Sequence, residues 1–141
     1  MELGLKGKAA IVTGAGKGIG RAVCLDLARE GAKVIAADMD IDAAKSVCRE
    51  VEALNGEARA YQVDVTDKSS VRGLIDFTCR EFQKVDILVN SAGIISIAKV
   101  IDLEERAWDK VMEVNAKGVF LVCQAVLKHM IDQGSGKILN I

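Results

Sequence analysis

The stretch Ala9-Ala10-Ile11-Val12-Thr13-Gly14-Ala15-Gly16-Lys17-Gly18-Ile19-Gly20-Arg21 decides the fold. It begins as an apolar run long enough for one buried strand, passes through alternate glycines and restarts as a helix near Gly18. Glycines admit positive φ angles and let a ligand approach the backbone, because they carry no Cβ. The following helix would direct its unpaired N–H groups and the positive end of its dipole at the loop. The stretch therefore predicts a strand–loop–helix unit that suits a pyrophosphate.

The spacing of the glycines narrows the interpretation. The general dinucleotide pattern G-x-G-x-x-G fails, because its third glycine would fall on Ile19. A phosphate-binding P-loop also fails, because no Gly-Lys pair is followed by Ser or Thr. The pattern that fits is Thr-Gly-x-x-x-Gly-x-Gly, read at Thr13, Gly14, Gly18 and Gly20.

This pattern is the cofactor motif of the short-chain dehydrogenase/reductase family, which the chain resembles from end to end. The resemblance implies an NAD(P)-dependent oxidoreductase that moves hydride between a nicotinamide and an alcohol or ketone. It also implies a set of cofactor-binding residues in the loop: Gly14, Gly16, Lys17, Gly18, Ile19 and Gly20. The alternative is a glycine-rich turn that binds no ligand.

Length and composition predict one domain, residues 1–141, with its own core. Hydrophobic residues make up 50% of the chain, and the formal net charge is −1. A chain with so little net charge has no strong positive electrostatic potential to attract nucleic acid or an anionic membrane. No apolar run approaches the length of a membrane span, and the first five residues do not form a signal peptide. We therefore predict a cytoplasmic protein that binds neither nucleic acid nor membrane.

The cysteines and the single histidine carry no metal signature. Cys24, Cys48, Cys79 and Cys123 are widely spaced and form no C-x-x-C pair. They are interpreted as reduced, buried helix residues, so no metal site is predicted. His129 has no acid or cysteine at the spacing of a proton relay and is interpreted as a surface helix residue.

Strand-like and helix-like segments alternate along the whole chain. Strands are predicted at residues 9–13, 33–38, 58–63, 85–90 and 137–141, and helices at residues 18–30, 41–54, 67–82 and 103–133. Asp102 and Glu105 are predicted to start the last helix as a capping box. Such alternation predicts right-handed crossovers in a doubly wound parallel sheet of the Rossmann type. The chain is expected to be truncated after the fifth strand.

Asp38 closes the second predicted strand, 18 residues after Gly20. An acid roughly 20 residues after the glycines accepts hydrogen bonds from an adenosine ribose. The family resemblance implies NAD preference from such an acid, whereas Lys17 is typical of NADP enzymes. We favour NAD, because a 2′-phosphate beside Asp38 would be a direct like-charge clash. The alternative role for Asp38 is a helix-entry cap.

Two further strand ends match the family. Asp64 and Val65 follow the third strand, where the resemblance implies an acid and a backbone amide at the adenine edge. Asp64 could instead cap the turn into the next helix. Asn90, Ala92 and Gly93 resemble the family's Asn-Asn-Ala-Gly motif, with Ser91 in place of the second Asn. Open α/β sheets bind ligands at these strand ends.

The catalytic residues of the family are represented only by Asn115. The resemblance implies that Asn115 belongs to the catalytic tetrad and orders a water; the alternative is a helix asparagine satisfied by a neighbouring loop. The family's Ser and Tyr-x-x-x-Lys are absent, and the only tyrosine, Tyr61, lies on the third strand. The chain thus resembles the N-terminal half of the family.

Two functional hypotheses follow. In the first, the chain is an N-terminal, inactive piece of an oxidoreductase acting on a small-molecule alcohol, ketone or acyl substrate, such as a 3-oxoacyl-[acyl-carrier-protein] reductase or a sugar or polyol dehydrogenase. In the second, it is a non-catalytic dinucleotide-binding or oligomerisation module. An open strand edge at residues 137–141 and a bare apolar helix face predict homo-oligomers.

Overall fold

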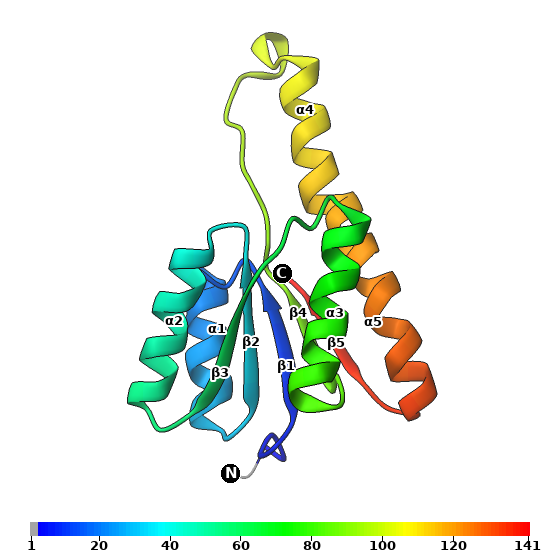
Figure 1. Cartoon of the computed structure of the whole chain (residues 1–141). Coiled ribbons are helices and arrows are strands. Elements are labelled where there is room, and N and C mark those ends of the chain that lie inside the picture. The colour runs from blue at the N-terminus through cyan, green and yellow to red at the C-terminus, as the bar shows by residue number, and fades with distance from the viewer. Residues whose placement is uncertain (1–2) are drawn as a thin grey trace.

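The computed structural model describes residues 3–141, and its centre is β1 (Ala9–Thr13), of which every residue is buried. β1 pairs in parallel with β2 (Lys33–Asp38) on one side and β4 (Ile87–Asn90) on the other. β3 (Glu57–Gln62) and β5 (Lys137–Asn140) form the two edges, giving the order β3-β2-β1-β4-β5. The predicted doubly wound parallel sheet is confirmed, and its strands all end on the same side (Figure 1).

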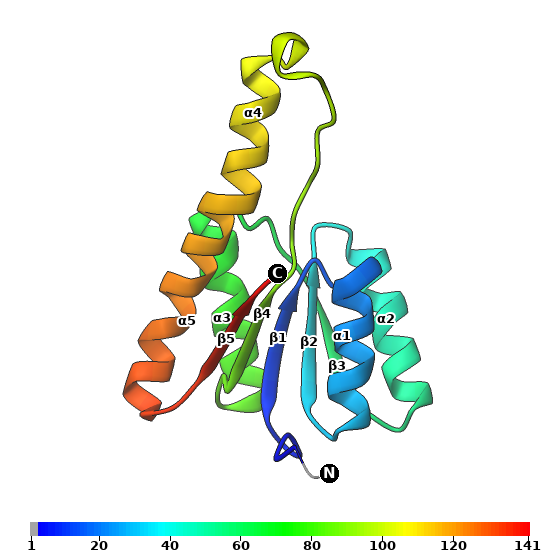
Figure 2. The same cartoon turned by 180° about the vertical axis from the view of Figure 1, so that it is seen from behind.

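Helices cover both faces of the sheet. α1 (Gly18–Arg29) and α2 (Ile41–Ala53) lie on one face, and α3 (Lys68–Phe82) and α5 (Val119–Gln133) lie on the other (Figures 1 and 2). Successive strand residues point to opposite faces, so Ile11 joins the core beneath α3 and α5 while Val12 joins the core beneath α1 and α2. The apolar runs of the central strands follow from burial on both faces.

The long helix predicted at residues 103–133 is wrong in two respects. Asp102 is the last residue of a 3-10 turn, Val100–Asp102, and α4 begins only at Glu105 and ends at Met112. The predicted capping box does not form, because Glu104 is the N-cap and its side chain makes no cap bond. A π-helical turn, Glu113–Gly118, joins α4 to α5. Residues 105–133 form one rod whose α4 end projects beyond the sheet (Figure 2).

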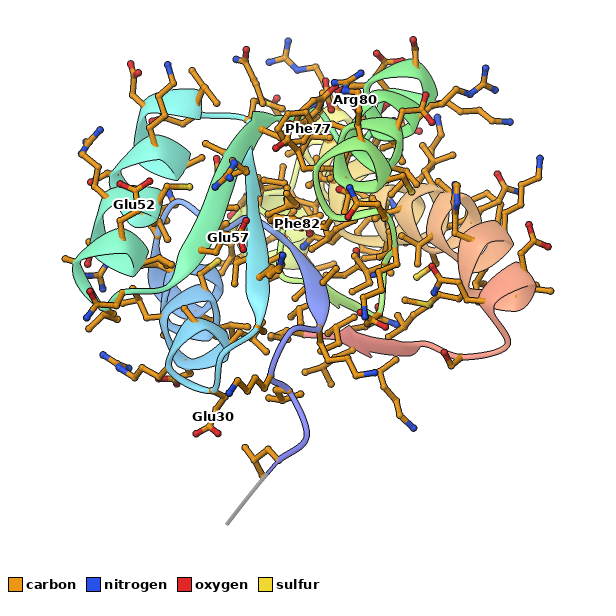
Figure 3. All side chains as sticks on the ribbon, turned by 60° about the horizontal axis from the view of Figure 1, so that its bottom comes forward. Glu30, Glu52, Glu57, Phe77, Arg80 and Phe82 are labelled. Atoms are coloured by element: carbon orange, nitrogen blue, oxygen red, sulfur yellow. The ribbon has the colours of Figure 1, made fainter. Side chains whose placement is uncertain are left out.

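The third strand and α3 carry the aromatic contacts. Tyr61 lies on β3, as expected, and its ring packs against Phe77 with the ring centroids 5.0 Å apart. The Arg80 guanidinium lies 5.7 Å from the Phe77 centroid, on the same helix (Figure 3). The Tyr61–Phe77 contact joins α3 to β3, so the only tyrosine of the chain is part of the packing.

The cysteine and histidine interpretations are partly corrected. All four cysteines lie free on helices, but only Cys24 and Cys48 are buried, whereas Cys79 and Cys123 are half-buried. His129 is also half-buried, because its Nδ1 lies 3.7 Å from Cys79 Sγ across the α3–α5 contact.

Residues 3–141 contain no cluster of side chains suited to a metal ion. Over the same residues, no helix is both long and apolar enough to cross a membrane.

Asp86 ties the start of β4 to β1. Its carboxylate accepts a 2.8 Å hydrogen bond from the Ala9 N–H and is flanked by Lys84 Nζ at 2.9 Å and Lys8 Nζ at 3.7 Å. Burial acts to raise the pKa of Asp86, but the Ala9 N–H and the two lysines outweigh it and hold the pKa below its ordinary value. The charged form is therefore favoured by folding.

We predict that Asp86→Ala lowers the free energy of unfolding by roughly 1–3 kcal/mol, because the Ala9 N–H loses its buried acceptor. Asp86→Asn keeps an acceptor and should cost less. Because the pKa of Asp86 is lower in the folded than in the unfolded chain, its charged carboxylate stabilises the fold at pH values above the unfolded pKa of about 4. This stabilisation is lost as the pH falls through the folded pKa. Urea unfolding at several pH values should therefore show a shallower acid limb in both variants, and an unchanged limb would contradict this role.

Candidate dinucleotide site

A cavity of about 400 Å³ opens where β1, β2 and β4 end. It brings together predicted residues from four separate segments and adds four apolar residues that belong to no predicted motif: Met39, Val63, Ile94 and Val114. Its walls are Gly14, Lys17, Gly18, Ile19, Asp38, Met39, Val63, Val65, Ser91, Ala92, Gly93, Ile94 and Val114. β2 and β4 flank β1 on opposite sides, which makes this the switch point of the sheet, where open α/β folds bind ligands. A larger groove of about 570 Å³, between α3 and α5, lies away from these strand ends.

The glycine loop is locked against the end of β4. Gly14 has φ +63°, and a Cβ there would lie 2.7 Å from the Ala92 backbone, so no other residue fits. The buried Thr13 hydroxyl accepts hydrogen bonds from the Ser91 N–H at 3.3 Å and the Ala92 N–H at 3.2 Å. Thr13, the first residue of the motif, therefore links the glycine loop to the segment that follows β4.

Asp38 faces the glycine loop. Its Oδ2 accepts a 2.8 Å hydrogen bond from the Gly16 N–H, and its Oδ1 accepts one of 2.9 Å from the Asp40 N–H. The helix-cap alternative for Asp38 does not hold, because Asp40 caps α2 through the Asp42 and Ala43 N–H groups. A Cβ on Gly16 would lie 2.7 Å from the Ala43 Cβ, so Gly16 is required by close packing although it stands outside the three-glycine pattern.

The N-terminus of α1 differs from those of α2 and α3. Asp40 and Asp67 cap α2 and α3 with their carboxylates. The N-cap of α1 is Lys17, no side chain caps this end, and the first turn holds no acid. The first-turn N–H groups of α1 thus face the loop without a carboxylate, in the arrangement that binds an anion.

Asp64 is committed to a turn. Its Oδ1 accepts hydrogen bonds from the Thr66 hydroxyl at 2.7 Å and the Thr66 N–H at 2.9 Å. These bonds hold the pKa of Asp64 below its ordinary value, the hydroxyl contributing most. Asp67, not Asp64, caps α3. Val65 lines the cavity and Asp64 does not, so the structure brings only the second residue of this pair to the site.

Asn90 lies behind the cavity. Its side chain is buried on the α5 side of the sheet, where Nδ2 donates to Asn140 Oδ1 at 2.8 Å and contacts Cys123 Sγ at 3.3 Å. Its Oδ1 is buried without a hydrogen-bond partner among the described residues. Asn140 was missed from the sequence, because its pairing with Asn90 follows from the parallel register of β4 and β5, which the sequence alone does not give.

Asn115 clamps the loop that follows β4. Its Oδ1 accepts from the Ile94 N–H and its Nδ2 donates to the Ile94 carbonyl, both at 2.8 Å. Asn115 therefore matches the alternative of an asparagine satisfied by a neighbouring loop. It does not line the cavity but fixes Ile94, which does. The clamp sits in the π-helical turn, where Asn115 and Gly118 both weaken a regular helix.

The family follows from comparison with known proteins. The family described as short chain dehydrogenase matches residues 8–141. The chain therefore belongs to the short chain dehydrogenase family, whose members bind nicotinamide cofactors.

Individual relatives agree in sequence and in fold. The chain is 40% identical over 137 residues to a 3-oxoacyl-[acyl-carrier-protein] reductase of Thermotoga maritima, covering 97% of this chain and 56% of that protein. It is 39% identical to D-threitol dehydrogenase of Mycolicibacterium smegmatis, with 97% and 53% covered. The structure of NAD⁺-bound xylitol dehydrogenase superposes with a TM-score of 0.94 at 39% identity, covering 96% of this chain and 53% of that one. The chain thus spans about half the length of the curated relatives it matches.

We predict that Asn115→Ala releases Ile94 and raises amide hydrogen exchange at residues 93–95, with a loss of about 1 kcal/mol in the free energy of unfolding. Asn115→Asp is the matched control, because it can accept from the Ile94 N–H but cannot donate to the Ile94 carbonyl, and it should give an intermediate effect. Unchanged exchange in Asn115→Ala would contradict the clamp.

Proposed function

We propose that the chain binds NAD(H) in the cavity at the ends of β1, β2 and β4. The observation that carries the proposal is the uncapped N-terminus of α1 beside the glycine loop, in a protein whose next two helices are each capped by an aspartate. The pyrophosphate would bind the loop formed by Gly14, Gly16, Lys17, Gly18, Ile19 and Gly20. Asp38 would accept hydrogen bonds from the adenosine ribose.

The remaining predicted residues would enclose the two ends of the cofactor. Val65 and, through its turn, Asp64 would border the adenine. Ala92 and Gly93 would pass close to the cofactor with their backbone, and Asn90 would support them from behind the sheet. These assignments rest on the position of each residue around one cavity.

NAD is favoured over NADP by the charges at the adenosine end. Asp38 already accepts two backbone N–H groups and cannot turn its charge away without losing them. Lys17 is the only cationic side chain lining the cavity within residues 3–141 and lies at the N-cap of α1, where it can meet the pyrophosphate of either cofactor. A 2′-phosphate would therefore lie nearer a carboxylate than a cation.

We predict that the chain binds NAD⁺ more tightly than NADP⁺ and that Asp38→Asn narrows this difference at least tenfold. The asparagine removes the charge but keeps an oxygen for the Gly16 N–H, whereas Asp38→Ala loses both and should weaken all binding. Isothermal titration calorimetry with both dinucleotides measures the ratio. Tighter NADP⁺ binding by the unaltered chain would reverse the assignment.

For the whole protein, we propose a dehydrogenase or reductase that moves hydride between the nicotinamide and a small-molecule alcohol, ketone or acyl substrate. The named relatives are a 3-oxoacyl-[acyl-carrier-protein] reductase, a D-threitol dehydrogenase and a xylitol dehydrogenase, which supports an acyl or polyol substrate. The nicotinamide would supply the hydride chemistry. Among this chain's residues, Asn115 and Ile94 would position the wall of the site nearest to the reacting groups.

A second proposal is that these 141 residues alone bind the dinucleotide without catalysis. Lys17 and Asp38 are the only ionisable side chains lining the cavity in residues 3–141. Tyr61 packs against Phe77, and His129 lies against Cys79, so neither side chain lines the cavity. Among the described residues, no group is then placed to exchange a proton with the substrate oxygen.

We further propose that the chain self-associates. Its cytoplasmic location stays a prediction.

We predict that the 141-residue chain shows no NADH oxidation above background with ketones, aldehydes or acetoacetyl thioesters. Loss of a positioned acid–base group typically costs a factor of about 10²–10⁴. NADH binding, followed by its fluorescence in the same samples, serves as the control that the site is folded. Sustained turnover by a preparation whose intact mass matches 15.1 kDa would contradict the prediction.

A further inference from the structure

The groove of about 570 Å³ between α3 and α5 is separate from the dinucleotide cavity. The two helices lie side by side on the face of the sheet opposite to α1 and α2 (Figure 1). We call this hollow the α3–α5 groove. None of its lining residues lines the cavity at the strand ends. Its walls are Lys68, Val71, Arg72, Ile75, Asp76, Leu121, Gln124, Ala125, Lys128 and His129.

The floor of the α3–α5 groove is apolar. Val71, Ile75 and Leu121 belong to the buried core beneath the two helices, and Ala125 packs against that core. Val71 and Ile75 are four residues apart on α3, as are Leu121 and Ala125 on α5, so each pair forms neighbours on one helix face. A ligand in the groove therefore meets a strip of aliphatic side chains.

The sides of the α3–α5 groove are basic. Lys68, Arg72 and Lys128 line it, and all three are exposed. None of them takes part in an ion pair within residues 3–141. Asp76 is the only acid that lines the groove in the same part of the chain. The methylene stems of Lys and Arg add apolar surface to the sides, so the groove combines an apolar floor with unpaired positive charge.

Contacts at both ends of the groove show that α3 and α5 run in the same direction. Gly118, the N-cap of α5, packs against Val65, shortly before α3: a Cβ on Gly118 would lie 2.7 Å from Val65 Cγ2. Toward the other ends of the helices, Cys79 Sγ lies 3.7 Å from His129 Nδ1. Residues at similar distances from the two helix starts therefore lie at the same level along the groove.

This register separates the charges along the groove. Lys68 and Arg72, on the first two turns of α3, lie at the levels from the start of α5 to Gln124. Asp76 lies one turn further, at the level of Lys128. The end of the groove nearer the helix starts thus holds two cations and an amide without an acid, and the other end holds a cation and an acid.

The dimensions of the groove are those of a small-molecule site. Its volume falls within the range of roughly 300–1,000 Å³ that is usual for ligand pockets. Residues 68–76 rise about 12 Å along α3. Ten residues line the groove, whereas a stable protein interface takes about 20–30 residues on each side. A small elongated ligand therefore fits the groove better than a partner protein.

We propose that the α3–α5 groove binds an amphipathic monoanion with a carboxylate head and an unbranched alkyl tail, such as a medium-chain fatty acid. The carboxylate binds Arg72 and Lys68, because the Arg fork donates two parallel hydrogen bonds to a carboxylate and the second cation adds charge. Asp76 would repel the carboxylate at the other end of the groove. The tail lies along the floor over Ile75 and Ala125. This inference does not depend on cofactor binding.

Titration of the full ¹⁵N-labelled chain with sodium decanoate, below its micellar concentration, tests the groove. We expect saturable amide shifts confined to residues 68–76 and 121–129. Arg72→Glu should weaken binding about tenfold or more, because it removes a charged hydrogen-bond donor and repels the head. Decanol, which lacks the charge, and acetate, which lacks the tail, should each bind about tenfold more weakly or less. No saturable shift with decanoate, or equal affinity for decanol, would overturn the proposal.

Matched variants distinguish the groove from charge and from the cofactor site. Lys45→Glu makes a similar charge reversal at an exposed residue of α2, on the other face of the sheet, and should leave decanoate binding unchanged. Ala125→Phe fills the floor and should abolish decanoate binding, with circular dichroism and NAD⁺ titration as checks of the fold. Equal affinity of Arg72→Glu and the unaltered chain would contradict the assigned head position.

Two competition experiments complete the test. Saturating NAD⁺ should leave the affinity for decanoate unchanged, because the two sites share no lining residue. Displacement of decanoate by NAD⁺, with shifts centred on the strand ends, would place it in the dinucleotide cavity and overturn the proposal. An acidic amphipathic helical peptide is the competing occupant. If the peptide shifts the groove residues and decanoate does not, the groove is a protein-binding surface and the proposal is wrong.

Discussion

The contact between the ends of β1 and β4 is the constraint on which the rest of the site depends. The Thr13 hydroxyl accepts two backbone N–H groups from the β4 end, and Gly14 leaves no space there for a Cβ. This contact sets the distance between the glycine loop and the Ser91–Gly93 segment, both of which line the cavity. Asp86 makes a comparable link at the other end of the same two strands, through the Ala9 N–H.

The N-terminus of α1 has no carboxylate cap and can therefore bind an anion. α2 and α3 each have an aspartate cap, while Asp38, which faces the glycine loop, accepts the Gly16 and Asp40 N–H groups and does not cap α1. The positive end of the α1 dipole therefore faces the cavity. The Asp38 carboxylate lies near this helix end but does not cap it. This separation suits a ligand with a phosphate and a nearby hydroxyl-bearing sugar.

The π-helical turn Glu113–Gly118 lies between a wall of the cavity and exposed apolar residues of α4 and α5. Asn115, in the turn, holds Ile94 by two hydrogen bonds, and Ile94 lines the cavity. Met112 and Phe120, on either side of the turn, are exposed on the outer face. Asn115 thus reaches from this turn to the loop after β4, while Met112 and Phe120 stay exposed to solvent.

The sequence by itself determined the order of strands and helices and the position of the glycine loop, because hydrophobic periodicity and glycine spacing are local. β2 was predicted at residues 33–38 and found at Lys33–Asp38, and Asp38 was correctly placed at the strand end beside the loop. Only the tertiary structure decided what Asn90, Asp64 and Asn115 contact, since their partners are set by strand register and packing. Asn90 meets Asn140 across 50 residues of sequence, and Asn115 meets Ile94 across 21. The π-helical turn Glu113–Gly118 was likewise not predicted. The hydrophobic pattern along a helix contains no information about the contact between Asn115 and Ile94, which are far apart in sequence.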